Sequence, residues 1–149
     1  MGDSLDEAAR VVRELERFFD VHALERVNSG GLDVTVVDLG LVRGRRVIVA
    51  VLPEATEVNV RNSRRALAAA SFIASELGGP STRQTIIIYS RRGRLTRTAY
   101  LYLGFSTSRG ENDIIVVNGP PREVADLLAL LKATGIIAPR EDRVYPAKI

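Results

Sequence analysis

Apolar and polar residues follow a helical period at the start of the chain and a strand-like pattern soon after it. Apolar side chains recur at helical spacing as far as His22, behind the sequence Ser4–Glu7, which has the form of a capping box. The pattern predicts a helix that ends near Asn28, before the glycine pair at 30–31. Residues 1–30 are therefore expected to be an N-terminal helix.

Short runs rich in β-branched residues predict the strands. Residues 32–39 and 46–52 are two such runs, joined by a turn around Gly44, and residues 85–89 and 113–118 are two more. These runs indicate a small sheet.

Two further helices are predicted between and after these strands. The first has Asn62 or Ser63 as its N-terminal cap, carries a face of alanines and runs to the Gly78–Pro80 turn. The second has Pro121 in its first turn and ends at Gly135. The sequence therefore predicts one domain over residues 1–149. It would be a mixed α/β fold with helices packed on a small mixed sheet, consisting of the N-terminal helix, an α/β core at 31–134 and a tail at 135–149.

One segment, residues 94–103, fits two structures. Its residues alternate well enough for a strand, and residues 91–93 would then be a hairpin turn. Leu95, Ala99 and Leu103 also fit a helix that ends at Gly104. Periodicity leaves both structures open.

Composition excludes several classes of protein. The chain has no cysteine, so it has neither disulfides nor a thiolate metal site. The sequence shows no signal peptide and no apolar stretch near the roughly 20 residues of a membrane span. We expect a cytoplasmic protein without membrane contact. The basic residues are nearly all arginine and Gln84 is the sole glutamine, a pattern that suggests a thermophile.

Few residues suit catalysis. His22 is the only histidine, and its position on the apolar stripe of the first predicted helix indicates a structural role. Asp33, Asp38 and Glu54 flank the first two strands and leave a metal-dependent nuclease as an alternative, although no acid-x-Lys pair accompanies them. The glycines at 78–79 lack the lysine of a phosphate loop. We therefore expect no catalytic residue, metal, cofactor or small-molecule substrate.

The net charge is +3, but the positive charge is concentrated in the middle of the chain. Nine arginines and a single acid, Glu76, lie between residues 61 and 110. The densest group is Arg91, Arg92, Arg94 and Arg97, beside Tyr89, Tyr100 and Tyr102. Guanidinium groups bind phosphates and aromatic rings stack on unpaired bases, so this group favours RNA. Taken alone, it indicates a stand-alone RNA-binding domain; a solvated arginine surface is the other interpretation.

The order of segments resembles the kinase-binding subunit family of the KEOPS complex, in its archaeal type, a family that includes the human PRPK-binding protein. Residues 63–77 resemble the family's alanine-rich helix, and residues 84–90 resemble its strand that ends in serine. Gly93–Leu95 with Ala99, and then Leu103–Phe105, resemble the start and stop of its next helix. Residues 114–117 and 123–131 resemble its closing strand and helix.

The resemblance implies a non-catalytic regulatory subunit. Such a subunit binds and stimulates the small kinase/ATPase subunit of KEOPS. It also helps to recruit tRNA, through the 3′ CCA end, for threonylcarbamoyl-adenosine modification. The resemblance favours a helix for residues 94–103. On this basis the four clustered arginines are the expected tRNA-binding residues, and Tyr100, Tyr102 and Phe105 are the expected kinase interface.

Overall fold

The computed structural model describes residues 3–76, 84–109 and 112–134, and this part of the chain contains four helices and five strands. The helices are α1 (Ser4–Leu15), α2 (Val60–Glu76), α3 (Arg97–Arg109) and α4 (Arg122–Thr134). The strands are β1 (Ala23–Ser29), β2 (Leu32–Val42), β3 (Arg45–Val51), β4 (Gln84–Ser90) and β5 (Asp113–Asn118). The predicted fold class, a mixed α/β domain with a small mixed sheet, is confirmed. The predicted tail at 135–149 and the glycine stops at 78–79 and 135 lie outside the described residues.

The five strands form one sheet in chain order, β1-β2-β3-β4-β5. The first three strands are antiparallel neighbours, whereas β3, β4 and β5 are parallel to one another. Arg43 and Gly44 make the tight turn between β2 and β3, both with positive φ, at 55° and 78°. Such a turn matches the twist of the flanking strands, which explains the glycine at its second position.

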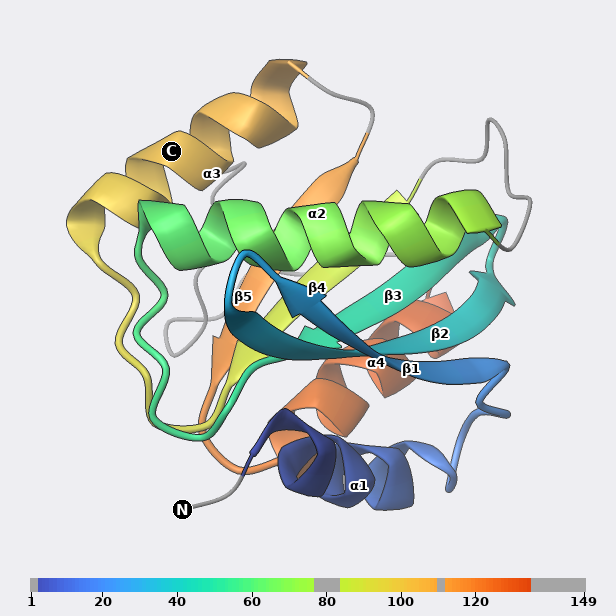
Figure 1. The fold of residues 1–149 in the computed structure, drawn as a ribbon. Helices are drawn as coiled ribbons and strands as arrows, with labels where there is room; N and C mark the ends of the chain where they lie inside the picture. The colour runs from blue at the N-terminus through green and yellow to red at the C-terminus, as the bar shows by residue number, and fades with distance from the viewer. Residues whose placement is uncertain (1–2, 77–83, 110–111, 135–149) are drawn as a thin grey trace.

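Helices cover both faces of the sheet (Figure 1). The two crossovers of the parallel strands, through α2 and α3, lie on one face. α1 and α4 cover the other face and contact each other as well as the sheet. Both crossovers progress along the sheet in the same direction, so no reversal of strand order divides β3, β4 and β5. The crevice that such a reversal creates in nucleotide-binding sheets is therefore missing from the described sheet.

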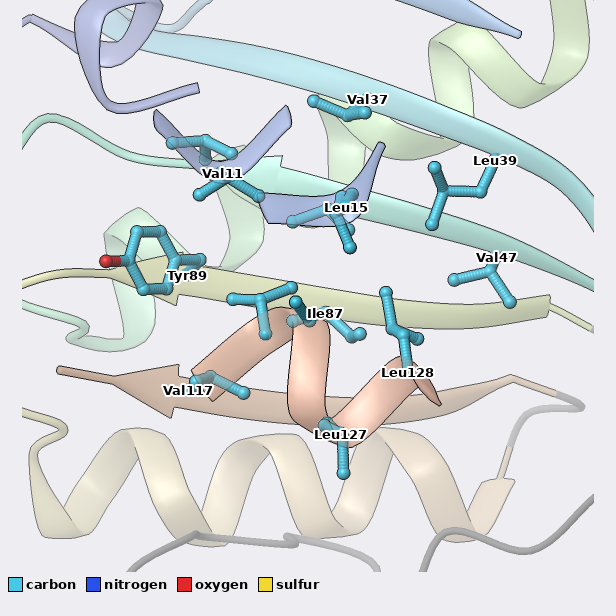
Figure 2. Close-up of a cluster of buried hydrophobic side chains, with 14 of the residues drawn as sticks. Val11, Leu15, Val37, Leu39, Val47, Ile87, Tyr89, Val117, Leu127 and Leu128 are labelled. Carbon is cyan, nitrogen blue, oxygen red and sulfur yellow. The ribbon is translucent and has the colours of Figure 1, made fainter. Parts of the chain in front are cut away.

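The side chains of the parallel strands divide between two apolar cores. Val47, Val49 and Val51 pack with α1 and α4, whereas Ile48 and Ala50 pack with α2. Figure 2 shows the first of these cores, where Val11 and Leu15 of α1, Leu127 and Leu128 of α4, and sheet residues such as Ile87 and Val117 converge. Both faces of the strands are buried, which is why their sequences are continuously apolar.

The predicted N-terminal helix at 1–30 is wrong in its second half. α1 ends at Leu15, and residues 23–29 form β1, which pairs with β2 through the Gly30–Gly31 turn. The glycines therefore end a strand instead of a helix. β1 is an edge strand in which most side chains are exposed, so it lacks the apolar alternation by which a strand is recognised.

Two predicted helix caps are displaced. Asp3, not Ser4, caps α1, since its carboxylate accepts from the backbone N–H of Asp6. Ser4 is buried and its hydroxyl contacts Asp33 and Thr35 of β2. α2 begins earlier than expected, because Asn59 accepts from the N–H of residue 62 at 2.8 Å. In both helices a polar residue upstream of the expected cap makes the capping hydrogen bond.

Residues 97–109 form a helix, which settles the alternative that periodicity left open. Leu95 precedes α3 and makes a single parallel bridge with Val58. The expected stop at Gly104 is wrong, because α3 continues through this buried glycine to Arg109. A glycine inside a helix costs only about 1 kcal/mol relative to alanine, so favourable packing overrides it.

Candidate nucleic-acid interface

Two connections at the carboxyl ends of the parallel strands bring the N-termini of α2 and α3 together. Val58, before α2, bridges Leu95, before α3. The Val58 N–H donates to the carbonyl of Arg94 at 2.8 Å, and the N–H of Thr96 donates to the carbonyl of Val58 at 3.1 Å. Figure 1 shows the two connections, green and yellow, side by side on their way to the helices. Each helix begins within two residues of the bridge.

The first turns of both helices carry arginine where acids are usually favourable. Asn59 caps α2 and Thr96 caps α3, the latter by accepting from the N–H of Ala99 at 3.1 Å. Neither first turn contains an acid, whereas Arg61 and Arg97 lie in them. A helix N-terminus already carries partial positive charge. Arginines at this position therefore raise the positive potential, an arrangement that a bound anion would stabilise.

We call the five arginines around these two helix starts the α2–α3 basic surface. Arg65 is half-buried and the other four are exposed; the five residues are Arg61, Arg64, Arg65, Arg94 and Arg97. Within residues 3–76, 84–109 and 112–134, none of them forms an ion pair. The nearby carboxylate of Glu57 accepts from the side-chain amide of Asn59 instead of from an arginine. Five guanidinium groups are therefore available to a partner.

The turn between β4 and α3 is held by a set of short hydrogen bonds. The hydroxyl of Ser90 donates to the carbonyl of Thr56 at 2.8 Å and accepts from the N–H of Gly93 at 3.1 Å. The side-chain amide of Asn118 donates to the carbonyls of Ser90 and Gly93, at 2.8 and 2.6 Å. A β-carbon on Gly93 would lie 1.6 Å from the carbonyl oxygen of Thr56, so only glycine fits. This turn fixes the start of the segment that carries Arg94 and Arg97.

The structure divides the four arginines that the sequence groups together. Arg94 and Arg97 belong to the α2–α3 basic surface. Arg92 instead pairs with Glu54 at 3.2 Å. Arg91 lies close enough to Tyr89 for its charge to lower the pKa of that phenol, although burial dominates and raises the pKa well above its ordinary value. Tyr89 itself packs in the α1–α4 core.

The aromatic side chains near these arginines have different surroundings. Tyr89 is fully buried and its hydroxyl donates to the carbonyl of Gly119 at 2.6 Å. Tyr102 packs against the α2 core, and Tyr100 is half-buried. Leu101 and Phe105, one helical turn apart on α3, are 50% and 59% exposed. Of the three residues expected at a kinase interface, Phe105 is thus the most exposed.

A groove that sequence reasoning missed lies beside the basic surface. The tip of the β1–β2 hairpin, at Ser29 and Gly30, faces the N-terminal half of α2 and leaves a cavity of about 610 Å³. The α2 side chains that line it are Val60, Arg61, Arg64, Arg65 and Ala68. The spacing of the arginines, at i, i+3 and i+4, was a usable signal because it places them on one helix face. The hairpin that forms the opposite wall is marked in the sequence by the Gly30–Gly31 pair alone, which suits a hairpin turn as well as the end of a helix.

Comparisons with family models, with curated proteins and with solved structures found no match for this chain. In the described part of the chain, no helix combines the length and the apolar character needed to cross a membrane. The choice between RNA binding and nuclease chemistry therefore depends on the contacts and charges of the described residues.

The three acids considered for a nuclease do not converge. Asp33 accepts two hydrogen bonds from Arg26, each 2.8 Å long, on the α1 side of the sheet. Asp38 pairs with the buried Arg46 at 2.8 Å on the α2 side, and Glu54 pairs with Arg92. Among the described residues, no three histidine or acidic side chains are grouped as a metal site would require.

The expected position of His22 is wrong. It follows α1 instead of lying on the helix, and it is exposed. The backbone N–H of His22 donates to the backbone carbonyl of Asp38 at 2.8 Å, just before the first paired residue of β1 and β2. The imidazole lies against Gly40, where a β-carbon would come within 2.8 Å of Nε2. The apolar residues that share its predicted stripe continue in a turn after α1, which explains the error.

Asp33 gives the fold an acid-sensitive contact. The Arg26 guanidinium, and then the Ser4 hydroxyl, hold the pKa of Asp33 below its ordinary value of 3.8 against the opposing effect of burial. A lowered pKa means that ionised Asp33 stabilises the fold above the unfolded-state pKa, and that this stability is lost as pH falls through the folded-state pKa. Asp33→Asn should therefore lower the free energy of unfolding near neutral pH, and the difference from wild type should vanish between about pH 5 and pH 2.

Urea denaturation across this pH range measures the effect. The change should be small and should weaken in high salt, because the pair is solvent-accessible. Asp20→Asn, at an exposed acid, is the matched control. A difference between wild type and Asp33→Asn that stays constant from neutral to acid pH would contradict the prediction.

Proposed function

We propose that this protein is a non-catalytic RNA-binding subunit that holds tRNA on the α2–α3 basic surface. The observation that carries the proposal is the set of five arginines at two adjacent helix starts, with no acid paired to any of them in the described residues. Arginine binds phosphate through a planar fork of donors. Phosphate contacts supply most of the affinity of proteins for nucleic acids.

Nuclease chemistry receives less support from the same geometry. A metal-dependent nuclease needs carboxylates that converge on an ion, so that it can activate water and stabilise the leaving oxygen. Here Asp33, Asp38 and Glu54 each pair with a different arginine, and the first two lie on opposite faces of the sheet. In these positions the acids neutralise cations of the fold.

The partner that we propose is the small kinase/ATPase subunit of KEOPS, in keeping with the family resemblance. The exposed side of α3 supports it, because Leu101 and Phe105 form an apolar stripe of the kind found in the core of an interface. Tyr100 flanks this stripe, whereas Tyr102 packs inward and is expected to act on stability. In this proposal tRNA and kinase occupy different parts of α3.

A calorimetric titration with the kinase subunit tests the proposed partner. Leu101→Ala combined with Phe105→Ala should weaken binding by about 2 kcal/mol or more, the usual effect of removing anchors from an interface. Leu130→Ala, which truncates an exposed leucine on α4 on the other face of the sheet, is the matched control. Equal affinities for the wild type and the double variant would remove the α3 stripe from the interface.

A tRNA titration tests the proposed function. Wild-type protein should bind tRNA without cleaving it in the presence of Mg²⁺, and loss of the 3′ CCA end should weaken binding because unpaired ends offer stackable bases. Replacement of the five arginines by alanine should remove most of the salt-dependent affinity. Magnesium-dependent cleavage that Asp33→Asn abolishes would favour the nuclease instead.

A further inference from the structure

The groove between the β1–β2 hairpin and α2 has a basic part and, one turn beyond it, an exposed aromatic ring. Arg61, Arg64 and Arg65 line the groove, and Ala68 is the last α2 residue in its wall. Phe72 follows Ala68 by four residues on the same helix face and is 54% exposed. A ring so exposed contributes little to the core, so the fold does not explain its position.

The groove is open, and its volume and positive charge would accommodate an anionic ligand. Its volume of about 610 Å³ lies within the range of roughly 300–1,000 Å³ that is usual for ligand pockets. Three of its seven lining residues are arginines and none is an acid. Ala68 leaves space on the helix surface between the guanidinium groups and the ring. A ligand with an anionic group and an attached aromatic group could therefore place the first on the arginines and the second on the Phe72 ring.

Gly30 lies against the guanidinium end of Arg65, so a side chain at position 30 would shift that arginine. Its φ is +60°, and a β-carbon there would lie 2.9 Å from Nε of Arg65. Gly31, the next residue of the same turn, has φ +92° and nothing within 4 Å of its β-carbon position. The two glycines both have backbone conformations that disfavour other residues, but only Gly30 leaves room for an arginine of the groove.

We propose that this groove binds single-stranded RNA, with phosphates on Arg61, Arg64 and Arg65 and a base stacked on Phe72. The inference rests on the proposed RNA-binding function and adds to it a preference for unpaired strands. Bases in a duplex are stacked on one another and cannot lie on a protein ring, whereas an unpaired base can. In this proposal the arginines bind the phosphates of single-stranded and duplex RNA, whereas Phe72 stacks only on a base of a single strand.

Fluorescence provides a direct test, since the chain contains no tryptophan. Phe72→Trp introduces one fluorophore at the proposed stacking position. Its emission should be quenched by a short oligouridylate and left unchanged by an RNA duplex of equal length. Quenching by both RNAs, or by neither while both bind, would overturn the stacking role.

Affinity measurements separate this inference from the proposed function. Phe72→Ala should weaken oligouridylate binding about 5- to 150-fold, the range for loss of one stacked base, and leave duplex binding unchanged. Phe72→Tyr should retain wild-type affinity, and Phe18→Ala, at an exposed phenylalanine after α1, is the control. Gly30→Ala should weaken the binding of both RNAs by shifting the Arg65 side chain, whereas Gly31→Ala, which carries backbone strain without that contact, should weaken it less. If Phe72→Ala changes both affinities equally, or changes neither, the inference fails while the proposed function stands; if wild-type protein binds no RNA, both fail.

Discussion

Gly93→Ala is expected to destabilise the protein by about 3 kcal/mol or more, a large effect for a single added methyl group. The new β-carbon would lie 1.6 Å from the carbonyl oxygen of Thr56, which is backbone and cannot move aside as a flexible side chain can. Relief of this overlap would separate the two connections and break hydrogen bonds that involve Ser90 and Asn118. Each buried polar group left without a partner costs about 1–3 kcal/mol.

Gly44→Ala is the matched control for this prediction. Gly44 has a φ of +78°, but nothing lies within 4 Å of its β-carbon position. Its replacement should cost only about 1–2 kcal/mol, the strain of a left-handed conformation. Urea denaturation of both variants measures the difference. If Gly93→Ala proves too unstable to purify, Asn118→Ala, which removes two hydrogen bonds of the same turn, should still be destabilised by about 1–3 kcal/mol. Equal stability of the Gly93 and Gly44 variants would contradict the close approach of Gly93 to Thr56.

The strands of the parallel part of the sheet could be predicted because each of these buried strands contains a continuous run of apolar residues. Residues 86–89 and 114–117 are buried against both helical layers, so these parts of β4 and β5 are apolar throughout. The edge strand β1 could not be predicted. Its sequence contains Glu25, Arg26 and Asn28, and its strand conformation results from pairing with β2. Helical spacing continued into this region by coincidence and extended the predicted helix too far.

The candidate site could be predicted only in part, for a similar reason. The sequence showed the dense arginines at 91–97, but the pairing of Arg92 with Glu54 depends on which residues the fold places beside it. Arg94 and Arg97 lie near Arg61 because Val58 pairs with the segment around Leu95, which is distant from it in the chain. The groove requires the hairpin tip to meet α2. Contacts of this kind depend on tertiary structure and have no local periodicity.

Replacement of all five arginines of the α2–α3 basic surface by alanine should have the largest effect on RNA binding. These side chains have no acidic partner in the described residues, so their removal should disturb the fold little. Each phosphate that is neutralised contributes about −0.7 to the slope of log affinity against log salt for single strands. If three of the arginines contact phosphates, the slope should flatten by about two units in the variant.

A control variant separates local contacts from net charge. Arg13→Ala combined with Arg17→Ala removes two positive charges near the end of α1, on the opposite face of the sheet. It should leave the salt slope of tRNA binding unchanged. Arg61→Ala combined with Arg97→Ala removes the same charge from the first turns of α2 and α3 and should flatten the slope. Phosphate contacts carry no sequence information, so Arg61→Ala combined with Arg97→Ala should weaken the binding of all tRNAs to the same extent.

The salt dependence of tRNA binding, measured from about 50 to 200 mM salt for wild type and these variants, is the most direct test of the central claim. If the α2–α3 basic surface binds tRNA, the slope should be steep for wild type and for Arg13→Ala/Arg17→Ala. The slope should be flatter by about one unit or more for Arg61→Ala/Arg97→Ala, and flatter still when all five arginines are replaced. Identical slopes for wild type and both pairs, or equal flattening by the two pairs, would show that the α2–α3 basic surface does not bind RNA.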